Sequence, residues 1–267
     1  HDMQRIFHTP EGVRDIYSQE CSRKQKLQEK LHRVFHQYGF EDIETPTFEY
    51  FEVFSKEVGT IPSRDLYKFF DREGNTLVLR PDFTPSVSRA CATYFNPEKE
   101  VVSLCYTGNT FINNSSFRGR LKETTQMGVE RMGDDSPEAD AEILAMTVEC
   151  LLATGLTEFQ VSVGQVDYYK AIFAQTGLSQ EEEEELRELI SQKNYFGVEE
   201  LVKNKNMDKS LARVLSQLPQ MFGSTEVLEK AKSLTDNPQA LKAVARLEEI
   251  YELLKVYGYE KYVTFDF

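Results

Sequence analysis

The amide of Gln126 and the carboxylate of Glu130 lie on either side of Gly128, each two residues away from it. Alternate residues of a strand share one face, so these three point one way and the two apolar residues between them point the other. A carboxamide beside a carboxylate suits an ammonium or imidazole group, and glycine leaves room for a ligand to approach the backbone. The alternative is a half-exposed strand whose polar face lies in water, and the pattern alone favours this alternative.

A second carboxylate lies in the segment Leu-Arg-Pro-Asp-Phe-Thr-Pro at residues 79–85. Asp82 stands between a predicted buried strand and the start of a helix, where loops often carry function, and its carboxylate can bind the ammonium group of a substrate. Thr84 and Pro85 are typical of an N-cap followed by the first helical position. The pattern does not separate ligand binding from simple capping by Asp82 and Thr84.

A basic loop provides a third candidate, because Arg118, Arg120 and Lys122 surround a glycine. Three cations in such a loop can clamp an anion such as phosphate. A solvated loop is the more common arrangement. Arg118 and Arg120 are therefore only candidate anion ligands.

Metal-binding and cofactor-binding motifs are not found in the sequence. The four cysteines are Cys21, Cys91, Cys105 and Cys150. They form no C-x-x-C pair and no histidine is spaced to join them, which predicts buried free thiols. His32 and His36 lie one helical turn apart, but no third ligand is evident. The common phosphate, dinucleotide and hydrolase motifs are also absent, so we expect no metal and no cofactor.

Periodicity and turn residues divide the chain into helices and strands. Helices are predicted at 20–38, 84–94 and 137–153 (the last capped by Ser136), strands at 40–46, 101–111, 120–132, 158–164 and 262–267, and a hairpin at 65–71 and 76–79. Residues 167–257 have helical periodicity without a strand, and Ser179 with Glu182 is a capping-box pattern.

This order of elements predicts an α+β fold with an inserted helical subdomain. We expect a core at residues 1–166, a helical insertion at 167–257 and a return strand of the core at 258–267. A strand at the very end suggests that the C-terminal part of the fold is missing.

Composition narrows the class of partner. The formal net charge is −13 at pH 7, and acidity of this size repels a phosphate backbone, which counts against a nucleic-acid partner. No apolar run reaches the roughly 20 residues of a membrane helix, and no signal peptide is visible. We therefore expect a cytoplasmic protein, without a membrane partner, that binds a small ligand or another protein.

The segments in this order resemble the class II histidyl-tRNA synthetase family. Three of its segments, L-R-P-[ED]-x-T, Q-x-G-x-E and D-A-E, are similar to residues 79–84, 126–130 and 140–142. Its opening P-x-G-x-x-D is similar to residues 9–15, and its motif 1, which builds the dimer interface, to residues 38–46. Motif 2 corresponds to residues 106–120. The resemblance implies a class II aminoacyl-tRNA synthetase-like antiparallel sheet flanked by helices. It also implies that Asp82, Thr84, Gln126 and Glu130 line a pocket for histidine.

Motif 2 departs from the synthetase pattern F-R-x-E, in which the arginine grips the phosphate of the aminoacyl-adenylate. Here residues 111–114 are Phe-Ile-Asn-Asn, so Ile112 replaces the arginine and Asn114 the glutamate. An apolar side chain cannot stabilise charge that develops on a phosphoryl group. Residues 82–85, Asp-Phe-Thr-Pro, also replace the usual Glu-Gly-Thr-Ala and are similar to the branch of the family that lacks aminoacylation, the regulatory subunits of ATP phosphoribosyltransferase.

The resemblance to that branch implies a non-catalytic regulatory subunit, a homodimer within a hetero-oligomer, that associates with the catalytic phosphoribosyltransferase. It implies a requirement for this subunit in the first step of histidine biosynthesis, with histidine as the feedback effector. A truncated histidyl-tRNA synthetase, which would bind ATP and charge tRNA, is the alternative. A synthetase-like paralogue that modifies or binds something else is a third possibility.

Overall fold

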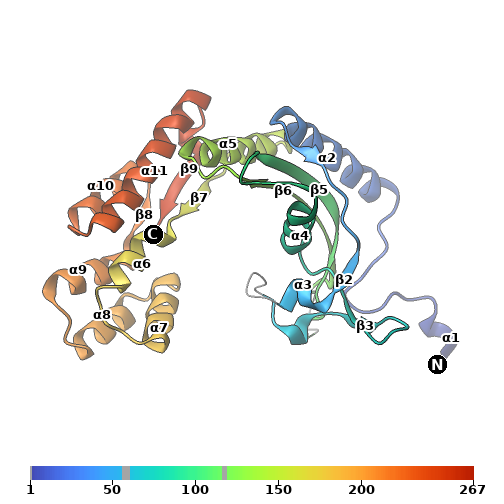
Figure 1. Cartoon of the computed structure of the whole chain (residues 1–267), viewed down its shortest axis with the longest axis horizontal. Coiled ribbons are helices and arrows are strands. Elements are labelled where there is room, and N and C mark those ends of the chain that lie inside the picture. The colour runs from blue at the N-terminus through green and yellow to red at the C-terminus, as the bar shows by residue number, and fades with distance from the viewer. Residues whose placement is uncertain (1, 56–60, 116–118) are drawn as a thin grey trace. The chain divides into compact units, whose positions relative to one another are not determined.

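The computed structural model describes residues 2–55, 61–115 and 119–267, and the chain divides into two compact units, His1–Asp135 and Ser136–Phe267. Each unit has its own sheet structure and its own buried core (Figure 1). The division into two compact units does not test whether residues 167–257 are an insertion into a core. The expected division into residues 1–166, 167–257 and 258–267 therefore stays a prediction.

The first unit alternates helices and strands. Its helices are α1 (Asp2–Arg5), α2 (Ser18–Gln37), α3 (Phe51–Ser55) and α4 (Thr84–Tyr94), and its strands are β1 (Glu41–Asp42), β2 (Phe48–Tyr50), β3 (Lys68–Phe70), β4 (Thr76–Leu79), β5 (Val102–Phe111) and β6 (Glu123–Met132). The predicted helices at 20–38 and 84–94 correspond to α2 and α4. After α2, Gly39 adopts a φ of +83°, a left-handed conformation that favours glycine and turns the chain into β1.

The strands β5 and β6 form a long antiparallel ladder that carries the predicted site. Tyr106 lies opposite Gly128, Leu104 opposite Glu130, and Gly108 opposite Gln126 (this pair completes the same face). Because opposed residues share a face and neighbours alternate, the even-numbered residues of both strands lie on one face and the odd-numbered residues on the other. On its far side β5 pairs with β1 in parallel, so the sheet is antiparallel except at this edge.

Helices cover both faces of this sheet (Figure 1). Against the even-numbered face, α4 and the residue before it form a buried apolar cluster with β5: Phe83, Val87, Cys91, Val102 and Leu104. On the odd-numbered face, His32 and His36 of α2 reach Asp42 of β1, which pairs with Cys105 of β5. The two faces therefore present different chemistry to different helices.

A smaller antiparallel sheet, in the order β2-β4-β3, contains the predicted hairpin of residues 65–71 and 76–79. Its core consists of Phe54, Leu66 and Val78. The buried carboxylate of Glu49 on β2 accepts a 2.9 Å hydrogen bond from Arg89 of α4. This ion pair ties the small sheet to the helix that covers the large one.

The second unit is mainly helical. Its helices are α5 (Pro137–Ala153), α6 (Val166–Phe173), α7 (Gln180–Ser191), α8 (Tyr195–Asn204), α9 (Lys209–Gln217), α10 (Thr225–Ser233) and α11 (Pro238–Tyr257), and its strands are β7 (Val161–Gly164), β8 (Phe222–Gly223) and β9 (Val263–Asp266). The order β7-β9-β8 has one parallel and one antiparallel pair. The prediction of residues 167–257 without a strand was wrong at β8, a two-residue strand too short for an alternation signal.

Local caps explain where two of these helices begin. Ser136 accepts a hydrogen bond from the amide of Ala139, and Pro137 is the first helical residue of α5, as predicted. Ser179 and Glu182 form the predicted capping box of α7. Within the unit, the fully buried Tyr168 donates a 2.8 Å hydrogen bond to the carbonyl of Ala231, which joins α6 to α10.

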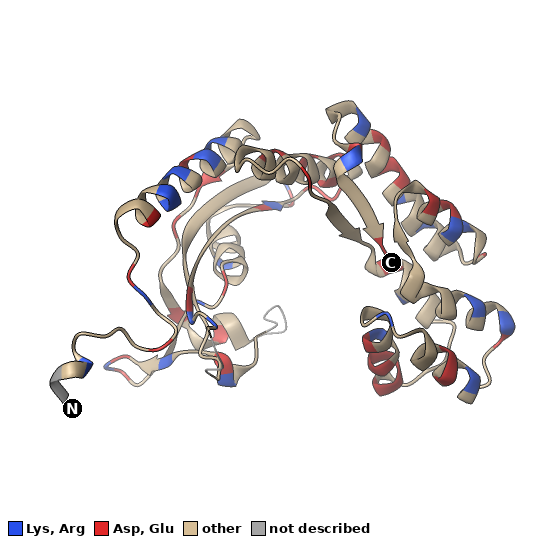
Figure 2. Cartoon of the chain, turned by 180° about the vertical axis from the view of Figure 1, so that it is seen from behind, with Lys and Arg blue, Asp and Glu red and all other residues tan. Residues whose placement is uncertain are grey.

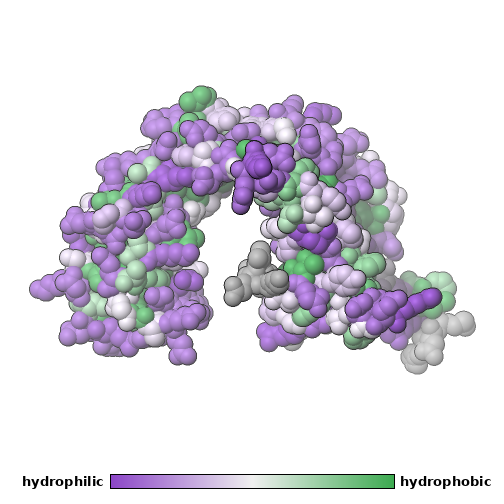
Figure 3. All heavy atoms as spheres, viewed as in Figure 1, coloured by the Kyte–Doolittle hydropathy of each residue, from purple (hydrophilic) through white to green (hydrophobic). Residues whose placement is uncertain are grey.

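The face shown in Figure 3 is mostly hydrophilic, with hydrophobic residues in small groups. Figure 2 shows acidic residues gathered on α7 and basic residues spaced along α2. Among the described residues, no helix combines the length and apolar character needed to cross a membrane.

Candidate functional site

The candidate site forms where the start of α4 meets the even-numbered face of β5 and β6. Thr84 Oγ1 donates a 2.6 Å hydrogen bond to Glu130 Oε1, and the Tyr106 hydroxyl donates to the same oxygen at 3.3 Å. Thr84 was predicted to cap the helix, but α4 begins at Thr84 itself and Phe83 is the N-cap residue. That part of the prediction was wrong, because the threonine side chain turns toward β6 and binds the carboxylate there.

Asp82 lies beside this group and has the capping role instead. Its Oδ1 accepts hydrogen bonds from the amides of Phe83 at 2.6 Å and Thr84 at 3.3 Å. Amides at the start of a helix have no intrahelical acceptor, so the carboxylate satisfies them. Both bonds end on Oδ1 of the half-buried Asp82 side chain, so Oδ2 accepts neither of them and is left for other contacts.

Tyr106 connects the two carboxylates electrostatically. Burial raises the pKa of its hydroxyl well above the ordinary value, and the negative charges of Glu130 and Asp82 raise this pKa further. The phenol is therefore protonated across the physiological range and remains a hydrogen-bond donor. The structure thus brings Asp82, Thr84 and Glu130 together around a tyrosine that the sequence analysis did not single out.

Gly128 has a different role from the one expected. A Cβ atom on Gly128 would lie 2.5 Å from the Tyr106 hydroxyl oxygen and 2.7 Å from its Cζ. The space above the glycine is therefore filled by the ring of its cross-strand partner, not left open for a ligand. A tyrosine directly opposite a glycine is visible only once the register of β5 and β6 is known.

A stack of side chains extends the site along β5. The ring of Tyr106 stacks on that of Phe83 with centroids 4.4 Å apart, and the guanidinium carbon of Arg80 lies 4.3 Å from the Phe83 centroid. Arg80 is buried and donates to the carbonyls of Asn109 at 2.7 Å and Thr45 at 3.1 Å. These bonds hold the guanidinium of Arg80 in place against the ring of Phe83. The sequence analysis did not single out Arg80 or Phe83 as site residues.

The remaining predicted residues are less well placed. Gln126 lies on the same strand face as Glu130, opposite Gly108, and its side chain is exposed. Arg120 is exposed in the loop before β6, and Arg118 lies outside the described residues. Their roles in binding histidine or an anion stay predictions.

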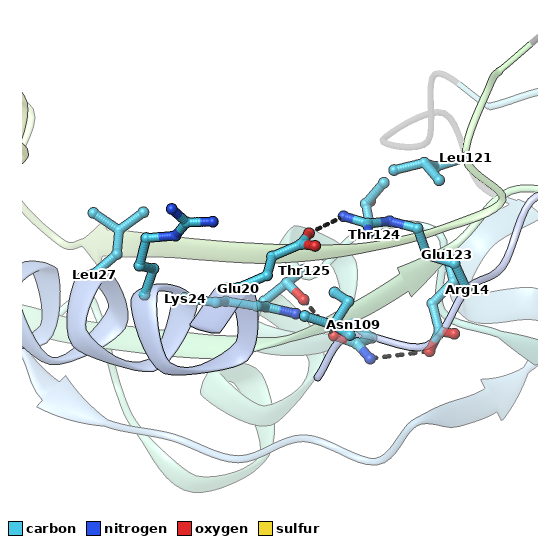
Figure 4. A pocket seen from close by; sticks show the side chains of 11 residues that line it. Arg14, Glu20, Lys24, Leu27, Asn109, Leu121, Glu123, Thr124 and Thr125 are labelled. Carbon is cyan, nitrogen blue, oxygen red and sulfur yellow. Dashed lines mark hydrogen bonds and ion pairs between the residues drawn. The ribbon is translucent and has the colours of Figure 1, made fainter. Parts of the chain in front are cut away.

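A separate hollow lies on the odd-numbered face, between the sheet and the first part of α2 (Figure 4). It has a volume of about 560 Å³ and includes Arg14, Glu20, Asn109 and Glu123. Arg14 pairs with Glu20 at 2.5 Å, and Asn109 donates to Glu123 at 2.9 Å. These polar groups pair with one another, and the hollow is lined by none of the residues that the sequence predicted to bind histidine.

The described residues also contain one set of side chains with donors suited to a metal ion. His32, His36, Asp42 and Cys105 have ligand atoms that all lie within 4.8 Å of one another. This set lies on the odd-numbered face, opposite to the face that carries Tyr106 and Glu130.

The sequence is similar to a known protein family and to individual proteins of known description. The family model for histidyl-tRNA synthetase matches residues 12–267. A protein of Acetivibrio thermocellus described as an ATP phosphoribosyltransferase regulatory subunit is 41% identical over 97% of this chain and 62% of its own length. One of Thermoanaerobacter pseudethanolicus with the same description is 38% identical over 98% of this chain and 68% of its own length. The chain thus spans about three fifths of the first of these relatives.

Solved structures give the same fold. The crystal structure of an ATP phosphoribosyltransferase regulatory subunit/histidyl-tRNA synthetase from Bacillus halodurans has a TM-score of 0.87 and 32% identity, covering 98% of this chain and 68% of that one. A histidyl-tRNA synthetase from a Nostoc species has a TM-score of 0.79 at 20% identity, covering 97% of this chain and 61% of that one, which shows the fold alone. The predicted class II synthetase-like α+β fold is confirmed.

Proposed function

Because the chain belongs to the histidyl-tRNA synthetase family, and within it to the branch of ATP phosphoribosyltransferase regulatory subunits, we propose that it acts as a regulatory subunit that binds histidine without activating it. The observation that carries this proposal is the convergence of Thr84 and Tyr106 on one carboxylate oxygen of Glu130, with Asp82 beside them.

The charges of this group suit the amino group of a free amino acid. Glu130 and Asp82 provide two anionic acceptors around a neutral phenol, and an ammonium group is a donor only. Gln126 on the same face offers an amide that can donate to or accept from an imidazole. Histidine has both of these groups, which is the reason for choosing it among amino acids.

The same region does not suit the activation of an amino acid by ATP. Ile112 follows directly after β5, and its amide donates to the carbonyl of Lys122 at 2.8 Å. In the synthetase pattern an arginine occupies this position and binds the phosphate of the adenylate. An aliphatic side chain supplies no positive charge to a developing phosphoryl anion, so the largest electrostatic contribution to catalysis is lost.

Regulation follows if histidine binds one assembly state of the complex more tightly than another. The partner in this proposal is the catalytic subunit of ATP phosphoribosyltransferase, and the complex performs the first step of histidine biosynthesis. Histidine bound near Glu130 then shifts the population of the hetero-oligomer toward its inhibited state. The acidic charge of the chain, −13, agrees with the loss of a tRNA partner.

Calorimetric titration of histidine into the chain, alone and mixed with the catalytic subunit, tests the proposal. We expect saturable binding that Glu130→Gln weakens, whereas Glu98→Gln, which changes an exposed carboxylate, leaves it intact. Exchange of pyrophosphate into ATP should stay at background with histidine present. Pyrophosphate exchange at synthetase-like rates, or charging of tRNA, would instead identify the chain as part of a synthetase.

A further inference from the structure

Four side chains from three elements meet on the odd-numbered face of the large sheet. His32 and His36 belong to α2, Asp42 to β1 and Cys105 to β5, and their ligand atoms all lie within 4.8 Å of one another. The cluster is separate from the group around Glu130, which lies on the opposite face of the same sheet. It therefore raises a separate question about what this arrangement binds.

The fold brings these residues together in three steps. Residues four apart on a helix lie one above the other, and the rings of His32 and His36 have centroids 4.0 Å apart. The turn at Gly39 reverses the chain, so that β1 runs back beneath the end of α2. The parallel pairing of β1 with β5 then places Asp42 beside Cys105 on the same face.

The contacts within the cluster centre on the carboxylate of Asp42. His32 Nε2 lies 2.5 Å from Asp42 Oδ1, and His36 Nε2 lies 2.9 Å from Oδ2. The Cys105 thiol donates to Oδ1 at 3.3 Å. The other three donor groups thus face the carboxylate of Asp42, and each histidine presents its Nε2 atom to it.

These distances are close to those of a tetrahedral metal site. Zinc binds imidazole nitrogen and carboxylate oxygen at about 2.0–2.2 Å and thiolate sulfur at about 2.3 Å, so the donor atoms of a tetrahedron lie roughly 3.4 Å apart. The observed separations of 2.5–3.3 Å to Asp42, within a group that spans 4.8 Å, require shifts of about 1 Å at each side chain. Rotation about side-chain bonds supplies such shifts.

The donor set also selects the class of ion. Two imidazoles, a thiolate and a carboxylate suit zinc and similar transition metals, whereas magnesium and calcium prefer oxygen ligands throughout. We propose that His32, His36, Asp42 and Cys105 form a structural binding site for one zinc-type divalent ion, which joins α2 to the sheet. With four protein ligands the coordination is complete, and no position remains open for a substrate.

An ion can reach the cluster from solvent. The side chains of His32 and His36 are 42% and 45% exposed, and they border a surface depression of about 530 Å³ together with Glu29, Arg33 and Gln37. Cys105 is buried at the base of the cluster. On binding, the metal replaces the Cys105 thiol proton and any proton held on the imidazoles, and these protons pass to solvent.

The competing explanation is a purely hydrogen-bonded cluster, in which Asp42 accepts from two imidazoles and no metal binds. Titration with Zn²⁺ alone after dialysis against a chelator distinguishes the two. We expect one Zn²⁺ per chain and a higher thermal unfolding midpoint in its presence, because an ion that binds only the folded state stabilises it. Co²⁺ should produce visible bands of a tetrahedral site and a near-ultraviolet band from thiolate ligation.

Matched variants assign the ligands. His36→Gln keeps a polar, exposed side chain on α2 and should lower Zn²⁺ affinity by at least about tenfold. Cys105→Ala should remove the thiolate band of Co²⁺, while Cys21→Ser, a thiol elsewhere on α2, and His8→Gln should change neither result. Circular dichroism checks that each variant folds. The proposal would be overturned if the native chain did not bind Zn²⁺. It would also be overturned if His36→Gln and Cys105→Ala bound Zn²⁺ as tightly as the native chain does.

Discussion

Thr84 Oγ1 and Glu130 Oε1 are joined by a 2.6 Å hydrogen bond between the first residue of α4 and the eighth residue of β6. The bond connects residues 46 positions apart and fixes the helix to the strand at the candidate site. It also holds one oxygen of Glu130, which leaves the other for a ligand. The first prediction follows from this contact.

Thr84→Val preserves the shape of the side chain and removes its hydroxyl. We expect the free energy of unfolding to fall by about 1.5–3 kcal/mol, the scale on which hydrogen bonds to charged groups contribute. Histidine binding should weaken as well, because Glu130 loses its orientation. Denaturant unfolding and calorimetry measure the two effects. Thr84→Ser keeps the hydroxyl and should behave like the native chain in both, and a loss in this variant would contradict the role assigned to the bond.

Gly128→Ala introduces a methyl group where the Tyr106 hydroxyl lies, at 2.5 Å. The ring must move away, which disturbs its stacking on Phe83 and its bond to Glu130. We expect destabilisation of about 1–3 kcal/mol, the usual cost of overpacking. In a Tyr106→Ala background the same change should cost much less. A double-mutant cycle measures this coupling, and purely additive effects would argue against the assigned contact.

The thiols should differ in their reactivity with iodoacetamide at pH 8. Burial and the neighbouring carboxylates raise the pKa of Cys150 to about 11 and that of Cys105 to about 12, and burial also raises the pKa of Cys91. Only the thiolate reacts, and at pH 8 a thiol of pKa about 11 is ionised in roughly one molecule in a thousand. Mass spectrometry of the metal-free chain should therefore find Cys21 labelled first. In guanidinium all four should react alike, and rapid labelling of Cys105 in the folded chain would refute this ordering.

Glu182, which pairs with Lys205 and belongs to the capping box of α7, should make the stability of the fold depend on pH in the acid range. The side chains of Lys205 and Ser179, together with the Ser179 backbone, hold the pKa of Glu182 at about 2 instead of its usual 4.5. Because the folded-state pKa is depressed, the ionised carboxylate stabilises the fold above about pH 4.5, and this contribution is lost as the pH falls toward 2. Thermal unfolding of Glu182→Gln should therefore depend less on pH in this interval. Glu181→Gln, on the same turn of the helix, serves as the control and should follow the native curve.

Local features of the fold could be predicted from the sequence. The bounds of α5, its cap at Ser136 and the capping box of Ser179 with Glu182 depend on residues within four positions of one another. The alternation at residues 126–130 likewise placed Gln126 and Glu130 on one strand face. The family resemblance then implied Asp82 and Thr84 as their neighbours. In the structure Thr84 bonds Glu130, and Asp82 lies near Tyr106, which bonds the same carboxylate.

Only the tertiary structure decided which distant residues meet. The register of β5 and β6 put Tyr106 above Gly128, and the pairing of β1 with β5 put Asp42 beside Cys105, next to His32 and His36. Helical spacing revealed the two histidines of this cluster, but not Asp42 and Cys105, its other two members. The physical reason is that periodicity states which face a side chain occupies, whereas strand pairing, which forms between segments far apart in the chain, determines what it touches there.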